Sequence, residues 1–163
     1  MKVAVIMRTY ERPVLLARAI AGVQQQTFRD WELVIVNNGG EPGPVDEVVE
    51  VALQTTGSGK ISVLHLPERT GMEAASNHGL RNSRSDYFAI HDDDDTWHPE
   101  FLSVAVARLG LSPHSAAVVT SLTRVTETMK GDKVWPVIEE AFWLNPGRLT
   151  YRGMIGAHTF PPV

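Results

Sequence analysis

The chain has 163 residues, of which 43% are apolar and 21% charged, and its formal net charge is −4 at pH 7. These values are ordinary for one globular domain with its own core, and the lack of a Lys/Arg block argues against a nucleic-acid partner. The absence of cysteine excludes disulfides, zinc–thiolate sites and cysteine nucleophiles, and no apolar run is long enough for a transmembrane segment. We expect a cytoplasmic protein, which can also act at the periphery of a membrane.

The first two thirds of the chain alternate predicted strands with predicted helices. Continuous apolar and β-branched runs predict buried strands at 2–7, 31–36, 61–66 and 87–90. Apolar residues at helical spacing predict helices at 13–25, 44–54, 72–83 and 99–110. This alternation predicts a doubly wound α/β fold with a mainly parallel sheet.

The last third has a weaker pattern. A β-branched stretch predicts a fifth strand at 116–125, residues 129–133 resemble a hairpin turn, and short strands are expected at 134–137 and 141–144. Residues 155–163 have no terminating pattern, and we expect a chain that is cut within a domain.

Four consecutive aspartates, Asp92 to Asp95, follow the strand predicted at 87–90. Adjacent carboxylates about 4 Å apart repel by roughly 1 kcal/mol in bulk water and about 4 kcal/mol at an effective dielectric of 20, so a partly buried cluster needs cations. We expect the cation to be a metal, since Mg²⁺ and Mn²⁺ prefer oxygen ligands and Mg²⁺ is commonly shared between carboxylates and substrate phosphates. The plainer alternative is a solvated loop in which Asp95 or Thr96 caps the following helix.

Two other polar segments follow predicted strands, at 9–12 and 37–40. Ligands of open α/β sheets bind beyond the carboxyl ends of the strands. We therefore expect these two segments and the aspartates to meet at one crevice.

Motifs in these three segments and in two others resemble those of a known family. They are Thr9-Tyr10-Glu11-Arg12 after the first strand, Gln26-Thr27-Phe28 after the first helix, Asn37-Asn38-Gly39-Gly40, Ala75-Ser76-Asn77-His78-Gly79, and Asp92 to Trp97 followed by Pro99. In this order they resemble the opening of the family 2 glycosyltransferases of GT-A fold, over about residues 2–125. The resemblance implies a Rossmann-like α/β/α sandwich with a mainly parallel central sheet. It further implies a single domain over 1–163, with 1–125 the nucleotide-sugar-binding part and 126–163 the start of the acceptor part.

The resemblance also implies an enzyme that transfers a sugar from a nucleotide-diphosphate sugar, for which we expect a UDP-sugar, with inversion at the anomeric carbon. The cofactor it implies is Mn²⁺ or Mg²⁺. The acceptor is a saccharide, a lipid or a protein, and the sequence does not choose among them.

Carried over residue by residue, the motifs imply these roles. Thr9, Tyr10 and Arg12 line the base and phosphate side, and Asn38 stands where an Asp usually accepts a hydrogen bond from the base. Asp93 faces the ribose or a phosphate, Asp94 holds the metal and Asp92 shares either role. Asn77 belongs to the substrate-binding set through the Ala75-Ser76-Asn77 motif.

Three departures from the family pattern bear on these roles. Asn37-Asn38 replaces an acidic pair, and Ser76 stands where the family usually has Arg. The catalytic Asp of a later segment has no match, because Glu139 and Glu140 are the only adjacent acids after the aspartate run and nothing aligns them. The catalytic base stays unassigned.

Two alternatives come from other classes of protein. Asp92 within Asp92-Asp93-Asp94-Asp95-Thr96 also fits the Asp-x-Asp-x-Thr nucleophile motif of haloacid-dehalogenase-like phosphatases, although that motif normally follows the first strand. If Val163 is the true end of the chain, a non-catalytic nucleotide-sugar-binding domain is the other alternative.

Overall fold

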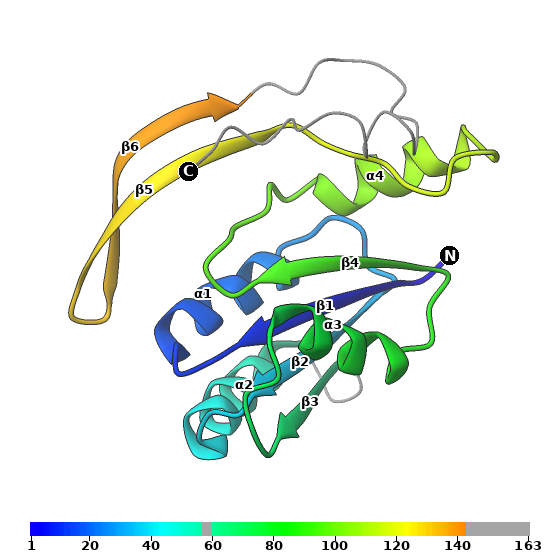
Figure 1. The fold of residues 1–163 in the computed structure, drawn as a ribbon. Coiled ribbons are helices and arrows are strands. Elements are labelled where there is room, and N and C mark those ends of the chain that lie inside the picture. The colour runs from blue at the N-terminus through cyan, green and yellow to red at the C-terminus, as the bar shows by residue number, and fades with distance from the viewer. Residues whose placement is uncertain (57–59, 143–163) are drawn as a thin grey trace. The chain divides into compact units, whose positions relative to one another are not determined.

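The computed structural model describes residues 1–56 and 60–142, which fall into two compact units, Met1–Val118 and Val119 onward. The first unit contains one sheet and four helices (Figure 1). Its elements are β1 (Val3–Thr9), α1 (Pro13–Gln24), β2 (Trp31–Asn38), α2 (Pro42–Thr56), β3 (Ile61–Leu66), α3 (Met72–Arg81), β4 (Tyr87–Asp92) and α4 (Phe101–Gly110). The strand–helix alternation predicted from the sequence is confirmed.

The four strands form one parallel sheet in the order β3-β2-β1-β4. Backbone pairing continues past the apolar runs, so that β1, β2 and β4 each end two residues later than predicted. In the resulting register, Thr9 lies beside Asn37 and Arg8 lies beside Asp92. Polar side chains of three strands are thereby brought to the same edge of the sheet.

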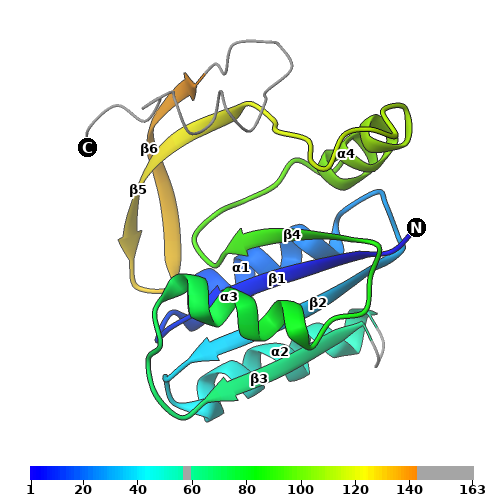
Figure 2. The same cartoon turned by 45° about the vertical axis from the view of Figure 1, so that its right-hand side comes forward.

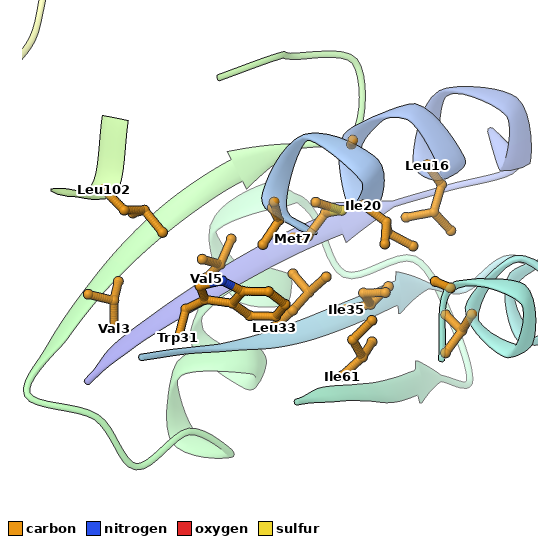
Figure 3. Packing of buried hydrophobic residues seen from close by; sticks show 14 of the residues in the cluster. Val3, Val5, Met7, Leu16, Ile20, Trp31, Leu33, Ile35, Ile61 and Leu102 are labelled. Atoms are coloured by element: carbon orange, nitrogen blue, oxygen red, sulfur yellow. The ribbon is translucent and has the colours of Figure 1, made fainter. Parts of the chain in front are cut away.

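Helices cover both faces of this sheet (Figure 2). Alternate residues of β1 and β2, including Val5, Met7 and Ile35, pack with residues of α1, α2 and α4 in the main core. Figure 3 shows Leu16 and Ile20 of α1 lying over Met7 and Ile35. The two-sided cover explains why Val3–Met7 of β1 and Leu33–Val36 of β2 are entirely apolar.

The opposite face of the sheet packs against α3. Its core contains Ala4, Ile6 and Val34, with the partly buried Leu64 beside them. A Cβ at Gly79 of α3 would lie 2.5 Å from Ile6 Cγ2 and 3.0 Å from Val36 Cγ2, so this position has no room for a side chain. The small residue lets α3 approach the sheet closely.

The second unit differs from the sequence-based expectation. Its described residues form an antiparallel hairpin of β5 (Leu122–Lys130) and β6 (Lys133–Phe142). The strand predicted at 116–125 was therefore placed too early, since the extended pattern runs on through alternating Thr, Glu and Met residues. The short strands predicted at 134–137 and 141–144 are one strand as far as residue 142, and Pro136 is accommodated next to a register shift.

The turn predicted at 129–133 is confirmed, and Gly131 adopts a positive φ of 64° there. Residues 143–144 and 155–163, on which two further expectations fall, lie outside the described residues. Among the helices of the described ranges, none is long and apolar enough to cross a membrane.

Close packing of α3 leads to a prediction on stability. Gly79→Ala is expected to lower the free energy of unfolding by about 1–2 kcal/mol, because the overpacking cost exceeds the gain in helix propensity. Gly22→Ala is the matched control, since a Cβ at Gly22 of α1 would meet nothing within 4 Å. It should raise stability by roughly 0.5–1 kcal/mol. Urea unfolding of both variants tests the pair, and an equal gain in both would contradict the close approach of α3.

Candidate functional site

An open pocket of about 240 Å³ lies in the first unit. Its lining comes from the ends of β1, β2 and β4 and from the segment before α3. The lining residues are Arg8, Thr9, Tyr10, Arg12, Asn38, Arg69, Gly71, Met72, Asp92, Asp93 and Asp94. The pocket is therefore where open α/β sheets place their ligands.

Arginines compensate the aspartates that end β4. Arg8 pairs with Asp92, and Arg12 Nη1 lies 3.3 Å from Asp93 Oδ1 and 3.0 Å from Asp94 Oδ2. Arg18 donates a hydrogen bond to the main-chain carbonyl of Asp94 at 2.7 Å. Arg8 of β1 and Arg12, just before α1, thus supply cations to the cluster, and a metal there stays a prediction.

The alternative role for the aspartate run, as a helix cap, is not supported. Helix α4 begins at Phe101 with Glu100 as its N-cap, and the cap makes no side-chain hydrogen bond. Asp95 instead donates its backbone N–H to the carbonyl of Asp92 in a turn.

The segment that follows the aspartates is fixed by the Gln26-Thr27 motif. Gln26 is fully buried, donates to the carbonyl of His98 at 2.9 Å and accepts from the backbone N–H of Leu102 at 3.0 Å. The backbone N–H of Thr27 donates to the carbonyl of Pro99 at 2.8 Å. This motif therefore tethers the far end of the aspartate loop to the end of α1.

The near end of the aspartate loop is fixed by aromatic packing. His91 is buried, its ring centroid lies 4.2 Å from that of Trp97, and Trp97 lies 4.4 Å from Phe101. His91 Nδ1 lies 2.7 Å from the carbonyl of Asp92 and so must carry the proton. Burial lowers the pKa of His91 from 6.5 to about 4, although the negative charges of Asp95, Asp93 and Asp94 act to raise it. The ring is neutral at pH 7.

Several buried polar atoms at this edge of the sheet have no hydrogen-bond partner among the described residues. They are Arg8 Nε, Thr9 Oγ1, His91 Nε2 and Asp93 Oδ2. Buried polar atoms are nearly always paired, so a concentration of unpaired ones needs an explanation. For Arg8, Thr9 and Asp93, which line the pocket, a ligand with hydroxyl or phosphate oxygens supplies one.

Two of the aspartates have raised pKa values. Burial is the main cause of the raised pKa of Asp93, and the nearby Arg12 guanidinium and Thr9 hydroxyl, the latter outside good hydrogen-bond geometry, oppose it. The pKa of Asp95 is raised first by burial and then by the charge of Asp94. These carboxylates are held in an environment that disfavours their charged form, as is common at functional sites.

The end of β2 is organised by two asparagine side chains. Asn37 is fully buried, and its Nδ2 donates to the carbonyls of Gly40 and Glu41 at 2.8 and 3.2 Å. Nδ2 also lies 3.1 Å from His65 Nδ1, and His65 Nε2 lies 3.0 Å from Asp46 Oδ1. An amide is required here, because a carboxylate has no N–H to give these acceptors.

The second asparagine ties β2 to the segment before α3. Asn38 Oδ1 accepts from the backbone N–H of Thr70 at 2.9 Å and from its hydroxyl at 3.1 Å. Asn38 Nδ2 makes a long contact of 3.4 Å with the carbonyl of Gly71. The neighbouring Gly39 has a φ of +83°, and a Cβ there would lie 2.4 Å from the backbone N of Arg69. The turn after β2 and the segment before α3 are thus locked together.

Most of the residues expected in the site lie in the pocket. Thr9, Tyr10, Arg12, Asn38, Asp92, Asp93 and Asp94 all line it. Asn77 does not line it and is exposed on α3. Sequence reasoning missed Arg8, Arg69, Gly71 and Met72, and only Gly71, which adopts a φ of +86°, carried a recognisable signal as a glycine at a helix start.

The pocket fits a divalent cation only in the company of a ligand. Among the described residues, no group of three or more His, Cys, Asp or Glu side chains could hold a metal ion. Asp94 nevertheless presents a half-exposed carboxylate to the pocket. One or two carboxylates are the usual protein contribution when Mg²⁺ is shared with substrate phosphates.

The fold and the pocket define an α/β protein with a polar pocket at the carboxyl ends of a parallel sheet. The family model described as Glycosyl transferase family 2 matches residues 4–159. The chain therefore belongs to this family, and its fold is that of the GT-A glycosyltransferases. This confirms the family and the fold class predicted from the motifs.

Individual relatives agree with this assignment. EpsE of Bacillus subtilis (strain 168), named as a glycosyltransferase, is 28% identical over 140 residues, which are 85% of this chain and 50% of EpsE. The succinoglycan biosynthesis protein ExoW of Rhizobium meliloti (strain 1021) is 32% identical over 104 residues, which are 62% of this chain and 32% of ExoW. The chain thus spans half or less of the length of these relatives.

A solved structure has the same fold. The mannosyltransferase PcManGT from Pyrobaculum calidifontis, in complex with GDP-Man and Mn²⁺, matches with a TM-score of 0.61 and 25% identity over 66% of this chain and 32% of that chain. The comparisons do not favour the phosphatase alternative or the non-catalytic one.

The hydrogen bonds of Asn37 lead to a prediction on stability. Asn37→Asp is expected to lower the free energy of unfolding by about 1–3 kcal/mol, because it removes the donors to two carbonyls and buries a charge beside them. The same substitution at the exposed Asn77 is the control and should change stability by less than about 0.5 kcal/mol. Both are measured by urea unfolding at pH 7. Equal stability of the two variants would show that the amide is not required.

The low pKa of His91 predicts a pH dependence. Between about pH 6.5 and 4 the unfolded chain binds a proton that the folded state rejects, so the contribution of His91 to stability is lost as the pH falls. The loss from pH 7.5 to 4.5 should be roughly 2–3 kcal/mol.

The test is urea unfolding at both pH values, in the presence of a chelator. Between pH 7.5 and 4.5, the wild type should lose roughly 2–3 kcal/mol more of its free energy of unfolding than His91→Gln does. The raised pKa values of Asp93 and Asp95 act with the opposite sign but are present in both proteins. His78→Gln, on the exposed side of α3, should behave like the wild type. An unchanged pH dependence in His91→Gln would exclude His91 as its source.

Proposed function

We propose that the protein is a glycosyltransferase that transfers a sugar from a nucleotide-diphosphate sugar, with a UDP-sugar as the first candidate, to a saccharide, lipid or protein acceptor. The observation that carries the proposal is that six residues expected to bind the donor line one pocket at the carboxyl ends of the strands, together with Asp94, the expected metal ligand. Family membership and the GDP-Man complex of PcManGT support a nucleotide-sugar donor.

The described residues suggest how the nucleotide is bound. Asp93 Oδ2 and Thr9 Oγ1 are buried without partners, and a ribose hydroxyl can donate to the first and accept from the second. Asn38 Oδ1 already accepts two hydrogen bonds from Thr70. Asn38 Nδ2 makes only a long contact with Gly71. It therefore donates a hydrogen bond to a carbonyl of the nucleotide base.

We assign the metal contact to Asp94, with Asp92 as the second candidate. Mn²⁺ or Mg²⁺ bound there would neutralise negative charge on the leaving diphosphate. Arg12 must release Asp94 for this, and both side chains are about half exposed, at 52% and 50%. Because an exposed ion pair contributes at most about 1 kcal/mol, the release is a small cost. Arg12 then becomes available to the phosphates.

The remaining steps rest on the family pattern. Inversion at the anomeric carbon requires a carboxylate that takes the proton of the acceptor hydroxyl. Glu140 is paired with Arg124 across the hairpin at 2.6 Å, and we assign no residue to this role. The lack of cysteine fits a cytoplasmic location, which includes the membrane periphery for a lipid acceptor.

Thermal unfolding with UDP or GDP, each with and without Mn²⁺, tests the proposal. A nucleotide present at a hundred times its dissociation constant adds about 2.7 kcal/mol, which for a domain of this size corresponds to a rise in Tm of roughly 5–10 °C. We expect such a rise with one nucleotide in the presence of Mn²⁺ and a much smaller one without it.

Asp94→Ala should remove the Mn²⁺-dependent part of the rise. Asp95→Ala is the matched control, because it removes a neighbouring carboxylate that does not line the pocket, and it should keep the rise. Equal loss in both variants would mean that overall charge, and not a specific contact of Asp94, is responsible. The absence of any rise in the wild type with either nucleotide would overturn the proposed donor site.

A further inference from the structure

A basic residue precedes each strand of the parallel sheet. Lys2 and Lys60 stand directly before β1 and β3, Arg29 stands two residues before β2, and Arg84 stands three residues before β4. Because parallel strands begin at the same edge of a sheet, these residues lie at one edge, opposite the pocket. Arg81 ends α3 at this edge, and Figures 1 and 2 show the loop from α3 to β4 on the side of the N-terminus. We call these five residues the basic edge.

Three residues of the basic edge have partners within the fold. Lys2 Nζ lies 2.5 Å from Glu32 Oε2. Lys60 Nζ donates to the carbonyl of Arg29 at 2.5 Å, and it also lies 4.7 Å from the centroid of the Trp31 ring. Arg29 Nη1 donates to the carbonyl of residue 24 at 3.2 Å, at the end of α1. Stability of the fold is therefore a sufficient reason for these three cations.

The other two cations, Arg81 and Arg84, lack such partners. Both side chains are exposed, and within residues 1–56 and 60–142 neither guanidinium has a hydrogen bond, an ion pair or a ring contact. A cation in the last turn of a helix stabilises the helix, which explains Arg81 in part. The backbone N–H of Arg84 donates to Glu32 Oε1 at 2.9 Å, so the residue is held at the edge while its charge stays free.

Exposed apolar side chains follow these arginines on β4. Phe88 pairs with Ala4 of β1, so both side chains lie on the same face of the sheet. Ala4 is fully buried on the face that packs against α3, whereas Phe88 is 56% exposed and Ile90 40% exposed. Unpaired basic residues together with an exposed Phe are the combination by which protein surfaces bind at the membrane interface.

We propose that the basic edge docks the protein on an anionic phospholipid bilayer, with Arg81 and Arg84 at the lipid phosphates and Phe88 among the headgroups. Arginine is suited to this contact, because a guanidinium donates paired N–H groups to phosphate oxygens. The inference goes beyond the proposed function and does not depend on it, since it concerns the opposite edge of the sheet.

The charge and the shape of the edge favour a bilayer. Its five basic residues face three acids, so the edge is positive in a chain of net charge −4; the acids are Asp30, Glu32 and Asp86. Neighbouring strands are about 4.8 Å apart, so the cations before four strands extend over roughly 15 Å. Such a row matches a plane of phosphates better than one small anion. A nucleic acid fits less well, because the chain has no continuous Lys/Arg block.

Vesicle co-sedimentation of the 163-residue chain, without nucleotide, tests the proposal. The vesicles are phosphatidylcholine alone and an equimolar mixture with phosphatidylglycerol. We expect binding to the mixed vesicles only, and weaker binding at higher salt. Arg84→Gln should weaken it by about fivefold and the double variant Arg81→Gln/Arg84→Gln by roughly 25-fold. Phe88→Ala should weaken it severalfold.

Arg69→Gln is the matched control, because it removes one exposed arginine at the pocket edge of the same sheet. It should bind the mixed vesicles as the wild type does. Circular dichroism and Tm without lipid verify that each variant is folded.

The orientation on the bilayer is tested with a fluorescent label, since the chain has no cysteine of its own. Asn82→Cys places the label directly after α3, beside the basic edge, and Met72→Cys places it at the first residue of α3, which lines the pocket. The two sites are about 15 Å apart along the helix. An environment-sensitive dye should shift to the blue on mixed vesicles at residue 82 and stay unchanged at residue 72.

Each contrary result bears on the basic edge alone. Absence of binding to the mixed vesicles overturns the proposal, while the donor site is tested separately by nucleotide. Equal binding by the wild type and the double variant, or equal binding to vesicles without phosphatidylglycerol, overturns it as well. A blue shift at residue 72 and not at residue 82 would show that the other edge of the sheet meets the bilayer.

Discussion

Repulsion among the aspartates at the end of β4 is the constraint on which the arrangement of the site depends. Four neighbouring carboxylates, one of them almost fully buried, are stable only where cations compensate them. The parallel register places Arg8 of β1 beside Asp92, and Arg12, the N-cap of α1, reaches the next two aspartates. The compensation is partial, since buried acceptors at this edge stay unpaired. A ligand that brings both donors and a cation fits what is missing.

The same region shows how rigid and adjustable contacts are divided. The aspartate loop is tethered at its far end by the buried Gln26 and at its near end by the stack of His91 on Trp97. The turn after β2 is locked to the segment before α3 by Asn38. The half-exposed pair of Arg12 and Asp94, in contrast, costs little to rearrange. Fixed backbone and movable cations are what a pocket needs when its ligand carries several negative charges.

Asparagine in place of the family's acidic pair has a physical reason at one of the two positions. Asn37 faces two backbone carbonyls and the acceptor nitrogen of His65, where only a donor is tolerated. At the second position the amide oxygen is occupied by Thr70. Both amides therefore hold the turn together, and at the second position only the amide N–H groups are left for a ligand.

The sequence by itself determined the order and type of the elements in the first unit, because each strand is a mainly apolar run and each helix has a clear apolar face. It also determined most of the site, since motifs such as Thr9-Tyr10 and the aspartate run follow strands whose carboxyl ends meet in any parallel sheet. It failed for the hairpin, where short alternating segments around Pro136 do not distinguish one long strand from two. Only the tertiary structure decided which cation meets which aspartate, that Asn77 lies outside the pocket and that Arg69 lies inside it. These are contacts between segments far apart in the chain, and no local pattern of residues encodes them.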